Sequence, residues 1–179
     1  MNHNLEDFLA MLLDGKDLLE DQSEALMTAM TEGEVEPALA GALLVALRMK
    51  GESAEEVRGF ANGMRKAAKE VELENSYELI DIVGTGGDGS HSFNISTGAA
   101  LLSAACGLKV AKHGNRSVSS KSGSADLLEF LGYRFPTDAD GVRAQMSMNG
   151  FSFLFAPNFH PAMKHIAPVS YTHLRAHET

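Results

Sequence analysis

The chain has 179 residues, enough for one full domain or for one small and one partial domain. Hydrophobic residues make up 44% of it and no apolar run is long enough to span a bilayer, which indicates a globular protein without a membrane anchor. The net charge of -9 counts against general nucleic-acid binding. The acidic start lacks a signal-peptide pattern and one cysteine cannot form an internal disulfide, so we expect a cytoplasmic protein with Cys106 as a small buried residue.

Residues 1–74 carry helical patterns only. The spacing of apolar residues predicts four short amphipathic helices, with Ser23 as the N-cap of the second and Ser53 as the N-cap of the fourth. Glu56 follows Ser53 by three residues, which is the spacing of a capping box. Glycines end the first three helices: Gly15, Gly33 and Gly51.

From residue 75 the pattern changes to strands that alternate with helices. This alternation predicts a parallel, doubly wound α/β sheet, in which ligands bind outside the carboxyl ends of the strands. The first helix of this part is expected to begin at Ser96 or Thr97. The predicted strands cover 77–83, 108–114 and 151–157, and the predicted helices cover 96–107, 124–132 and 140–150.

A glycine-rich loop, IVGTGGDGSHSFNIST, occupies residues 82–97. Its glycines have the dinucleotide spacing G-x-G-x-x-G, but the helix begins late and the next strand ends in Lys112 instead of an acid, which excludes that site. A nucleotide P-loop needs a lysine where this chain has Ser90. An anion held by backbone N–H groups and a helix N-terminus is the remaining functional interpretation, and a purely structural loop is the alternative.

A second donor-rich loop, KHGNRSVSSKSGSAD, follows the next predicted strand and begins at Lys112. Residues 89–125 contain no Asp or Glu but include four cations, a balance that focuses small anions locally. Two such loops at adjacent strand ends predict a ligand with two separated phosphate groups. His160 and His165 are poorly spaced for a shared metal, no Cys/His cluster has zinc spacing, and no nucleophilic triad stands out.

Three stretches together resemble the anthranilate phosphoribosyltransferase family: DIVGTGGDGSHSFNIST, AKHGNRSVSSKSGSADLLEFLG and FLFAPNFHPAMKHIAPV. The resemblance implies a helical N-terminal domain at 1–74, the first part of an α/β phosphoribosyltransferase domain at 75–169, and a tail of uncertain origin at 170–179. It also implies a glycosyltransferase that moves 5-phosphoribose from 5-phosphoribosyl 1-diphosphate (PRPP) to the amino group of anthranilate and releases diphosphate. This reaction is the second step of tryptophan synthesis from chorismate.

Site residues follow from the same resemblance by position. Gly84 and Asn115 are implied to border the anthranilate site, Ser96 is implied as a ligand of Mg²⁺, and no residue is implied as a catalytic acid or base. In the first loop and the helix start, the implied PRPP-binding residues are Gly84, Gly87, Asp88, Ser92, Asn94, Ile95, Ser96 and Thr97. In the second loop they are Lys112, His113, Gly114, Asn115, Arg116, Ser117, Val118, Ser119, Ser120 and Ser124.

Partners and the chain end are further expectations from the resemblance. It implies a homodimer through the helical domain and association with anthranilate synthase. After Val169 the chain departs from the family: Ser170 stands where the family has an anthranilate-binding Arg, and the downstream Asp-Glu pair that holds Mg²⁺ is missing. We therefore expect a truncated or chimeric end and a chain that keeps part of the PRPP site without turnover. A pyrimidine nucleoside phosphorylase and a non-catalytic nucleic-acid-binding relative are the alternatives.

Overall fold

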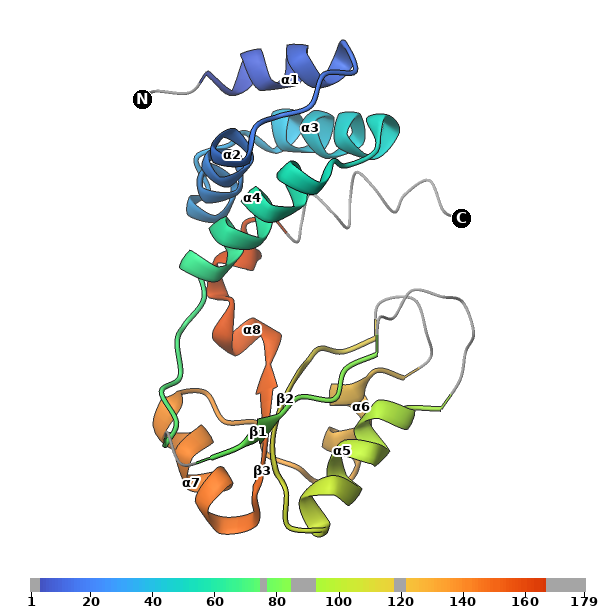
Figure 1. The fold of residues 1–179 in the computed structure, drawn as a ribbon, viewed down its shortest axis with the longest axis vertical. Coiled ribbons are helices and arrows are strands. Elements are labelled where there is room, and N and C mark those ends of the chain that lie inside the picture. Colours follow the sequence, from blue (N-terminus) through green and yellow to red (C-terminus); the bar gives the residue numbers. More distant parts are fainter. Residues whose placement is uncertain (1–3, 75–76, 85–92, 118–121, 167–179) are drawn as a thin grey trace. The chain divides into compact units, whose positions relative to one another are not determined.

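Figure 1 shows the computed structural model, which describes residues 4–74, 77–84, 93–117 and 122–166. The chain forms two compact units, and each is described here by itself. Residues 4–68 and 160–166 make up a helical unit, and residues 69–159 make up an α/β unit. The division at residue 74 from sequence stays a prediction. Across the described ranges, every helix is too short or too polar to cross a membrane.

The helical unit contains the four predicted helices. They are α1 (Leu5–Leu13), α2 (Glu20–Glu32), α3 (Pro37–Lys50) and α4 (Ala54–Lys66). The unit also contains the short 3₁₀ helix η1 (Pro161–Lys164) from a later part of the chain. Their apolar faces meet in one core, because each helix carries an apolar stripe that must be shielded from water. The buried core residues are Phe8, Leu12, Leu18, Leu26, Met30, Ala40, Leu43, Ala46 and Leu47.

Helices α2 and α4 pack closely because α4 carries glycine where it touches α2. A Cβ atom on Gly59 would lie 2.2 Å from the carbonyl oxygen of Glu20 and 2.7 Å from the Cβ of Ser23. Ser23 is therefore a buried contact residue inside α2, and its expected role as N-cap is wrong. The N-cap position lies four residues earlier, at Leu19, whose backbone N–H donates to the side-chain oxygen of Gln22.

The predicted capping box at the start of α4 is confirmed. The backbone N–H of Glu56 donates to the hydroxyl of Ser53 at 3.2 Å, and the backbone N–H of Ser53 donates to the Glu56 carboxylate at 2.7 Å. Glu56 is also fully buried and accepts hydrogen bonds from the backbone N–H of Leu18 at 2.9 Å and from Lys50 Nζ at 2.8 Å. One carboxylate therefore joins the α1–α2 connection, the end of α3 and the start of α4.

The α/β unit is built on a three-stranded sheet in the order β1-β2-β3, with both pairs parallel as predicted. The strands are β1 (Leu79–Ile80), β2 (Lys109–Gly114) and β3 (Phe151–Phe155). Leu79 is paired with Lys109 and Lys112 with Phe153. The helices are α5 (Ile95–Ala105), α6 (Ser124–Phe130), α7 (Ala139–Asn149) and the short α8 (Ala156–Phe159).

Helices cover both faces of this sheet, which confirms the doubly wound α/β class (Figure 1). Successive side chains of a strand point to opposite faces. Phe151 and Phe153 of β3 therefore pack with α5 and α6, while Leu154 packs with Val142 and Met146 of α7. The two faces form separate apolar clusters, and the sheet between them is buried on both sides.

Three local expectations in this unit are wrong. The first strand is shorter than 77–83, since only Leu79 and Ile80 pair with β2. Helix α5 begins at Ile95, with Asn94 at the N-cap position instead of Ser96 or Thr97. Cys106 is exposed because it directly follows the last residue of α5, where the helix ends at the surface.

Candidate functional site

The candidate site lies where β1 and β2 end. Residues 81–84 leave β1 and residues 115–117 leave β2, and the two strands are parallel, so both connections depart from the same edge of the sheet. Each connection leads to a helix, α5 or α6. This is the edge at which α/β sheets bind their ligands.

Asn94 ties the two connections together. Its amide Nδ2 donates to the carbonyl oxygen of Gly123 at 3.2 Å and to the hydroxyl of Ser122 at 3.4 Å. Asn94 occupies the N-cap position of α5 but makes no side-chain cap bond, and its amide donates across to the segment before α6 instead. The side chain therefore holds the start of α5 against the segment before α6, while the N–H groups of Ile95, Thr97 and Gly98 at the helix start donate to backbone carbonyls.

The start of α5 has the chemistry of an anion site. A Cβ on Gly84 would lie 3.8 Å from the hydroxyl oxygen of Ser96, so the first residues of the first connection are close to the helix start. Thr97 is fully buried, and its hydroxyl has no hydrogen-bond partner among the described residues. A buried hydroxyl without a partner is costly, and a bound oxygen atom would satisfy it. The helix N-terminus adds partial positive charge.

The second connection is closed by Asp126 in the first turn of α6. Its carboxylate oxygen Oδ2 accepts hydrogen bonds from the backbone N–H of Ser117 at 2.9 Å and of Gly123 at 2.7 Å. These two N–H groups are the main reason why the pKa of Asp126 is lowered. The hydroxyl of Ser124 donates to the carbonyl oxygen of Asn115 at 3.1 Å, which fastens the loop a second time.

Arg116 is engaged by carboxylates of its own unit. Its Nη2 lies 3.0 Å from Glu129 Oε1, its Nη1 contacts the other oxygen of Glu129, and Nη1 lies 3.3 Å from Asp126. Its guanidinium carbon also lies 5.7 Å from the ring centroid of Phe155. In this structure Arg116 therefore fixes the second connection to α6.

Lys112 lies beneath the first connection. Its side chain is only 1% exposed, and its Nζ donates to the backbone carbonyl of Ile82, just after β1. Burial lowers the pKa of Lys112, and the nearby carboxylate of Asp81 opposes that change. Gly114 at the end of β2 permits the close approach of α6, because a Cβ there would lie 2.6 Å from the hydroxyl of Ser124.

The structure gathers the described candidates at one edge of the sheet, with different roles. Gly84, Asn94, Ser96 and Thr97 meet around the start of α5, whereas Ile95 points outward and is 69% exposed. The end of β2 contributes Lys112, His113 and Gly114, the second connection contributes Asn115, Arg116 and Ser117, and the start of α6 contributes Ser124. Six candidates lie outside the described residues: Gly87, Asp88, Ser92, Val118, Ser119 and Ser120.

Sequence reasoning missed the residues that shape the second connection. A Cβ on Gly123 would lie 2.2 Å from the backbone nitrogen of Ser117, so only glycine fits there. Asp126 follows Gly123 by three residues, and this spacing is typical of an acid that accepts a hydrogen bond from the N-cap residue of a helix. The spacing could have predicted the contact from sequence. Glu129 lies one turn further along α6, on the side that pairs with Arg116.

Magnesium is the cation that the sequence resemblance implies. In the described part of the chain, no three His, Cys, Asp or Glu side chains gather as a metal site. The hydroxyl of Ser96 is a single hard oxygen ligand, and Mg²⁺ prefers oxygen ligands that include substrate phosphates. The described residues therefore fit a magnesium ion that arrives with a phosphorylated ligand, and they do not build a site for the free ion.

These features place the chain in a class of α/β proteins that have a separate helical unit and a candidate anion site at the carboxyl edge of the sheet. Two family models match the chain. Residues 6–68 match the helical bundle domain of the glycosyl transferase family, and residues 76–173 match its a/b domain. The chain therefore belongs to this glycosyl transferase family.

Individual relatives agree with this assignment. The chain is 47% identical over 164 residues to the anthranilate phosphoribosyltransferase of Polynucleobacter necessarius, which covers 92% of this chain and 48% of the relative. The crystal structure of anthranilate phosphoribosyltransferase from Thermus thermophilus matches with a TM-score of 0.81 and 47% identity, over 92% of this chain and 50% of that one. The Saccharomyces cerevisiae enzyme in complex with PRPP and Mg matches with a TM-score of 0.83 and 28% identity, over 93% and 50%. The chain thus spans about half the length of the relatives it matches.

Proposed function

We propose that this chain is the PRPP-binding part of an anthranilate phosphoribosyltransferase. The observation that carries the proposal is the start of α5, where the buried hydroxyl of Thr97 has no partner among the described residues and Ser96 lies beside Gly84. The named relatives support the substrate assignment, because the structure of one of them was solved in complex with PRPP and Mg. No feature of the described residues favours the nucleoside phosphorylase or the nucleic-acid-binding alternative.

The proposed chemistry is displacement at the anomeric carbon of the ribose, with the amine of anthranilate as nucleophile and diphosphate as leaving group. The start of α5 and the hydroxyls of Ser96 and Thr97 bind the phosphorylated substrate and hold the leaving group in place. A magnesium ion, when bound with the substrate, supplies positive charge against the diphosphate. Asn94 keeps the two connections at a fixed separation, which orients the ribose between them. The amine is already nucleophilic, so no strong base is required.

A homodimer through the helical unit is part of the proposal. Leu13 at the end of α1 and Met49 near the end of α3 are large apolar side chains that are exposed in the single chain, and Val45 on α3 is partly exposed. Exposed apolar groups on neighbouring helices are typical of an interface between copies. We also propose that the protein associates with anthranilate synthase and that it is cytoplasmic. The exposed thiol of Cys106 suits a reducing compartment.

Calorimetric titration of the chain with PRPP in the presence of Mg²⁺ tests the binding part. We expect saturable binding with Mg²⁺ and much weaker binding without it. Replacing Asn94 by Ala should weaken binding, because the two connections are no longer tied, whereas Asn149→Ala on the exposed end of α7 should leave it unchanged. Equal affinity in the two variants, or no binding by the parent chain, contradicts the proposed role. A phosphorolysis assay with pyrimidine nucleosides tests the alternative.

A further inference from the structure

The guanidinium group of Arg116 has three partners that together fix its place. Its Nη1 and Nη2 donate to the two carboxylate oxygens of Glu129, and Nη1 also donates to Asp126 at 3.3 Å. Its carbon lies 5.7 Å from the ring centroid of Phe155 at the end of β3. A guanidinium that contacts both oxygens of one carboxylate is fixed in direction as well as in position. Arg116 is therefore held between α6 and the carboxyl end of β3.

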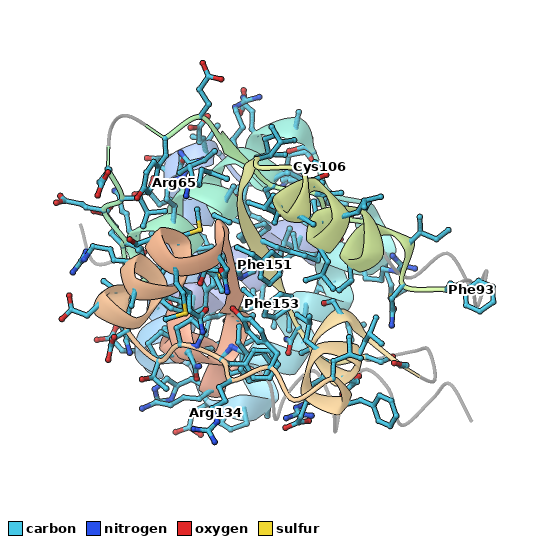
Figure 2. All side chains as sticks on the ribbon, turned by 90° about the horizontal axis from the view of Figure 1, so that it is seen from below. Arg65, Phe93, Cys106, Arg134, Phe151 and Phe153 are labelled. Carbon is cyan, nitrogen blue, oxygen red and sulfur yellow. The ribbon has the colours of Figure 1, made fainter. Side chains whose placement is uncertain are left out.

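The ring of Phe155 continues into the core of the α/β unit. It stacks on Phe135, with 5.0 Å between the ring centroids, and the ring of Phe135 lies 5.4 Å from that of Phe153. Phe153 is fully buried, and Figure 2 shows Phe151 and Phe153 in the interior of the unit. Close-packed aromatic rings have little freedom to move. The support for Arg116 on this side is therefore rigid.

The charges around Arg116 leave it little attraction for a phosphate. One guanidinium group faces two carboxylates, those of Asp126 and Glu129. Hydrogen bonds from Arg116 lower the pKa of Glu129, and backbone N–H groups lower the pKa of Asp126, so both carboxylates are charged at neutral pH. A phosphate that approached Arg116 would meet two anions beside it. A direct contact with the substrate would require Arg116 to leave Glu129.

The residues next to Arg116 in the chain are bound to α6 through their backbone. The N–H of Ser117 donates to Asp126 Oδ2 at 2.9 Å, in the first turn of α6. The carbonyl oxygen of Asn115 accepts a backbone hydrogen bond of 3.2 Å from the same turn. Glu129 lies one turn further along the helix, so its pair with Arg116 fixes the second connection at a separate point. A second fixed point opposes rotation of the connection about its first-turn contacts.

We propose that Glu129 is a positioning residue of the PRPP site. It holds Arg116 against Phe155, and Arg116 in turn keeps the donors of the second connection in place for the substrate without touching the substrate itself. This inference rests on the proposed function, since it concerns the binding of PRPP. It assigns to Arg116 the part in PRPP binding that the resemblance implies, exerted through the backbone of its neighbours.

Calorimetric titration with PRPP and Mg²⁺ separates positioning from direct contact by the sign of one effect. Glu129→Gln should weaken PRPP binding by about fivefold, a factor typical of coupling within one ion-pair network. Arg116→Gln and the double variant should weaken binding by a similar factor, because each change breaks the same pair. If Arg116 bound the phosphate directly, Glu129→Gln would strengthen PRPP binding, because a competing carboxylate would be removed. Stronger binding by Glu129→Gln would therefore overturn the proposal.

The control is Glu55→Gln, which removes the same charge from a carboxylate that also lies beside an arginine. The Glu55 side chain is 56% exposed, against 54% for Glu129, and its carboxylate lies 3.9 Å from Arg58. The PRPP affinity of this variant should stay within about twofold of the parent. Exposed ion pairs contribute little to stability, so all of these variants should melt within about 2 °C of the parent chain. Equal losses of affinity in Glu55→Gln and Glu129→Gln would contradict a specific role of Glu129.

Hydrogen exchange in the chain without PRPP tests the positioning separately from the proposed function. Loss of the Arg116–Glu129 pair should speed exchange of the Ser117 N–H, followed by NMR, by about threefold, because its contact with Asp126 opens more often. Equal rates in the parent, Arg116→Gln and Glu129→Gln chains would overturn the positioning role. Failure of the parent chain to bind PRPP would refute the proposed function, and the exchange rates would then decide alone whether Glu129 fixes the second connection.

Discussion

Replacing Glu56 by Gln should destabilise the helical unit strongly, although the two side chains have the same shape. Glu56 is fully buried and accepts hydrogen bonds from the backbone N–H groups of Leu18 and Ser53 and from Lys50 Nζ. A Gln side chain keeps one acceptor oxygen and turns an NH₂ group toward these donors. Lys50 would keep its ion pair with Asp17, which lies 2.6 Å from Lys50 Nζ. The loss of stability therefore falls at the lower end of the range for breaking a buried ion pair. We expect about 3 kcal/mol, which is a large part of a typical stability of about 5–15 kcal/mol.

Urea unfolding followed by circular dichroism measures this loss. With a slope of about 2 kcal/mol per molar, the midpoint should fall by about 1.5 M. The control is Glu55→Gln at the neighbouring position, where the carboxylate is exposed and 3.9 Å from Arg58. An exposed ion pair contributes little, so this variant should lose less than about 0.5 kcal/mol. Equal losses in the two variants would refute the reasoning.

The pH dependence supplies a second check on the same carboxylate. Burial acts to raise the pKa of Glu56, but the hydrogen bonds from Leu18, Lys50 and Ser53 together hold it below its ordinary value. A carboxyl group with a lowered pKa stabilises the folded state above its unfolded pKa, and this contribution disappears as the pH falls through its folded pKa. The gap between the parent chain and Glu56→Gln should therefore be full at pH 7, begin to shrink near the ordinary glutamate pKa of about 4.3, and close only below the lowered pKa of the folded state. A gap of constant size would contradict the assignment.

Three further pairs of measurements follow from local geometry. Gly59→Ala should lower the free energy of unfolding in urea by about 2 kcal/mol or more, because the new Cβ would meet α2. Gly98→Ala, where no atom lies within 4 Å of the new Cβ, should raise the free energy of unfolding by about 0.5–1 kcal/mol. A change of the same sign in both variants would contradict the packing of α4 on α2. Thr97→Val should raise the stability of the chain, because it removes a buried hydroxyl without a partner, and should weaken PRPP binding in calorimetry. Thr31→Val is the control: it loses a hydrogen bond to the Thr28 carbonyl and should lower the stability by about 1 kcal/mol. Cys106 should react with a thiol reagent in the native chain nearly as fast as in urea, and protection in the native state would contradict its exposure.

Sequence patterns predicted the elements of this fold well because the elements are fixed by local chemistry. Apolar spacing gave the four helices of the helical unit, and alternation of strands and helices gave the parallel sheet. The capping box at Ser53 was legible, but the burial of Glu56 was not, since its partners Leu18 and Lys50 come from other elements. The N-cap at Ser23 failed for the same reason: its contact with Gly59 is a tertiary one.

The candidate site shows where a reading of charge from sequence is incomplete. The segment without acids suggested that its cations attract an anion, but Arg116 is paired with Glu129 and Asp126, and burial lowers the pKa of Lys112. Lys109 of the same segment donates to the carbonyl of Met146. Among the described residues these three cations are engaged in the fold, and Lys121 lies outside the described residues. Backbone N–H groups and the start of α5 are therefore a further source of attraction for a phosphate. Such N–H donors depend on the geometry of the backbone. Glycine and hydroxyl residues indicate them in a sequence, but the donors come together only in the folded chain.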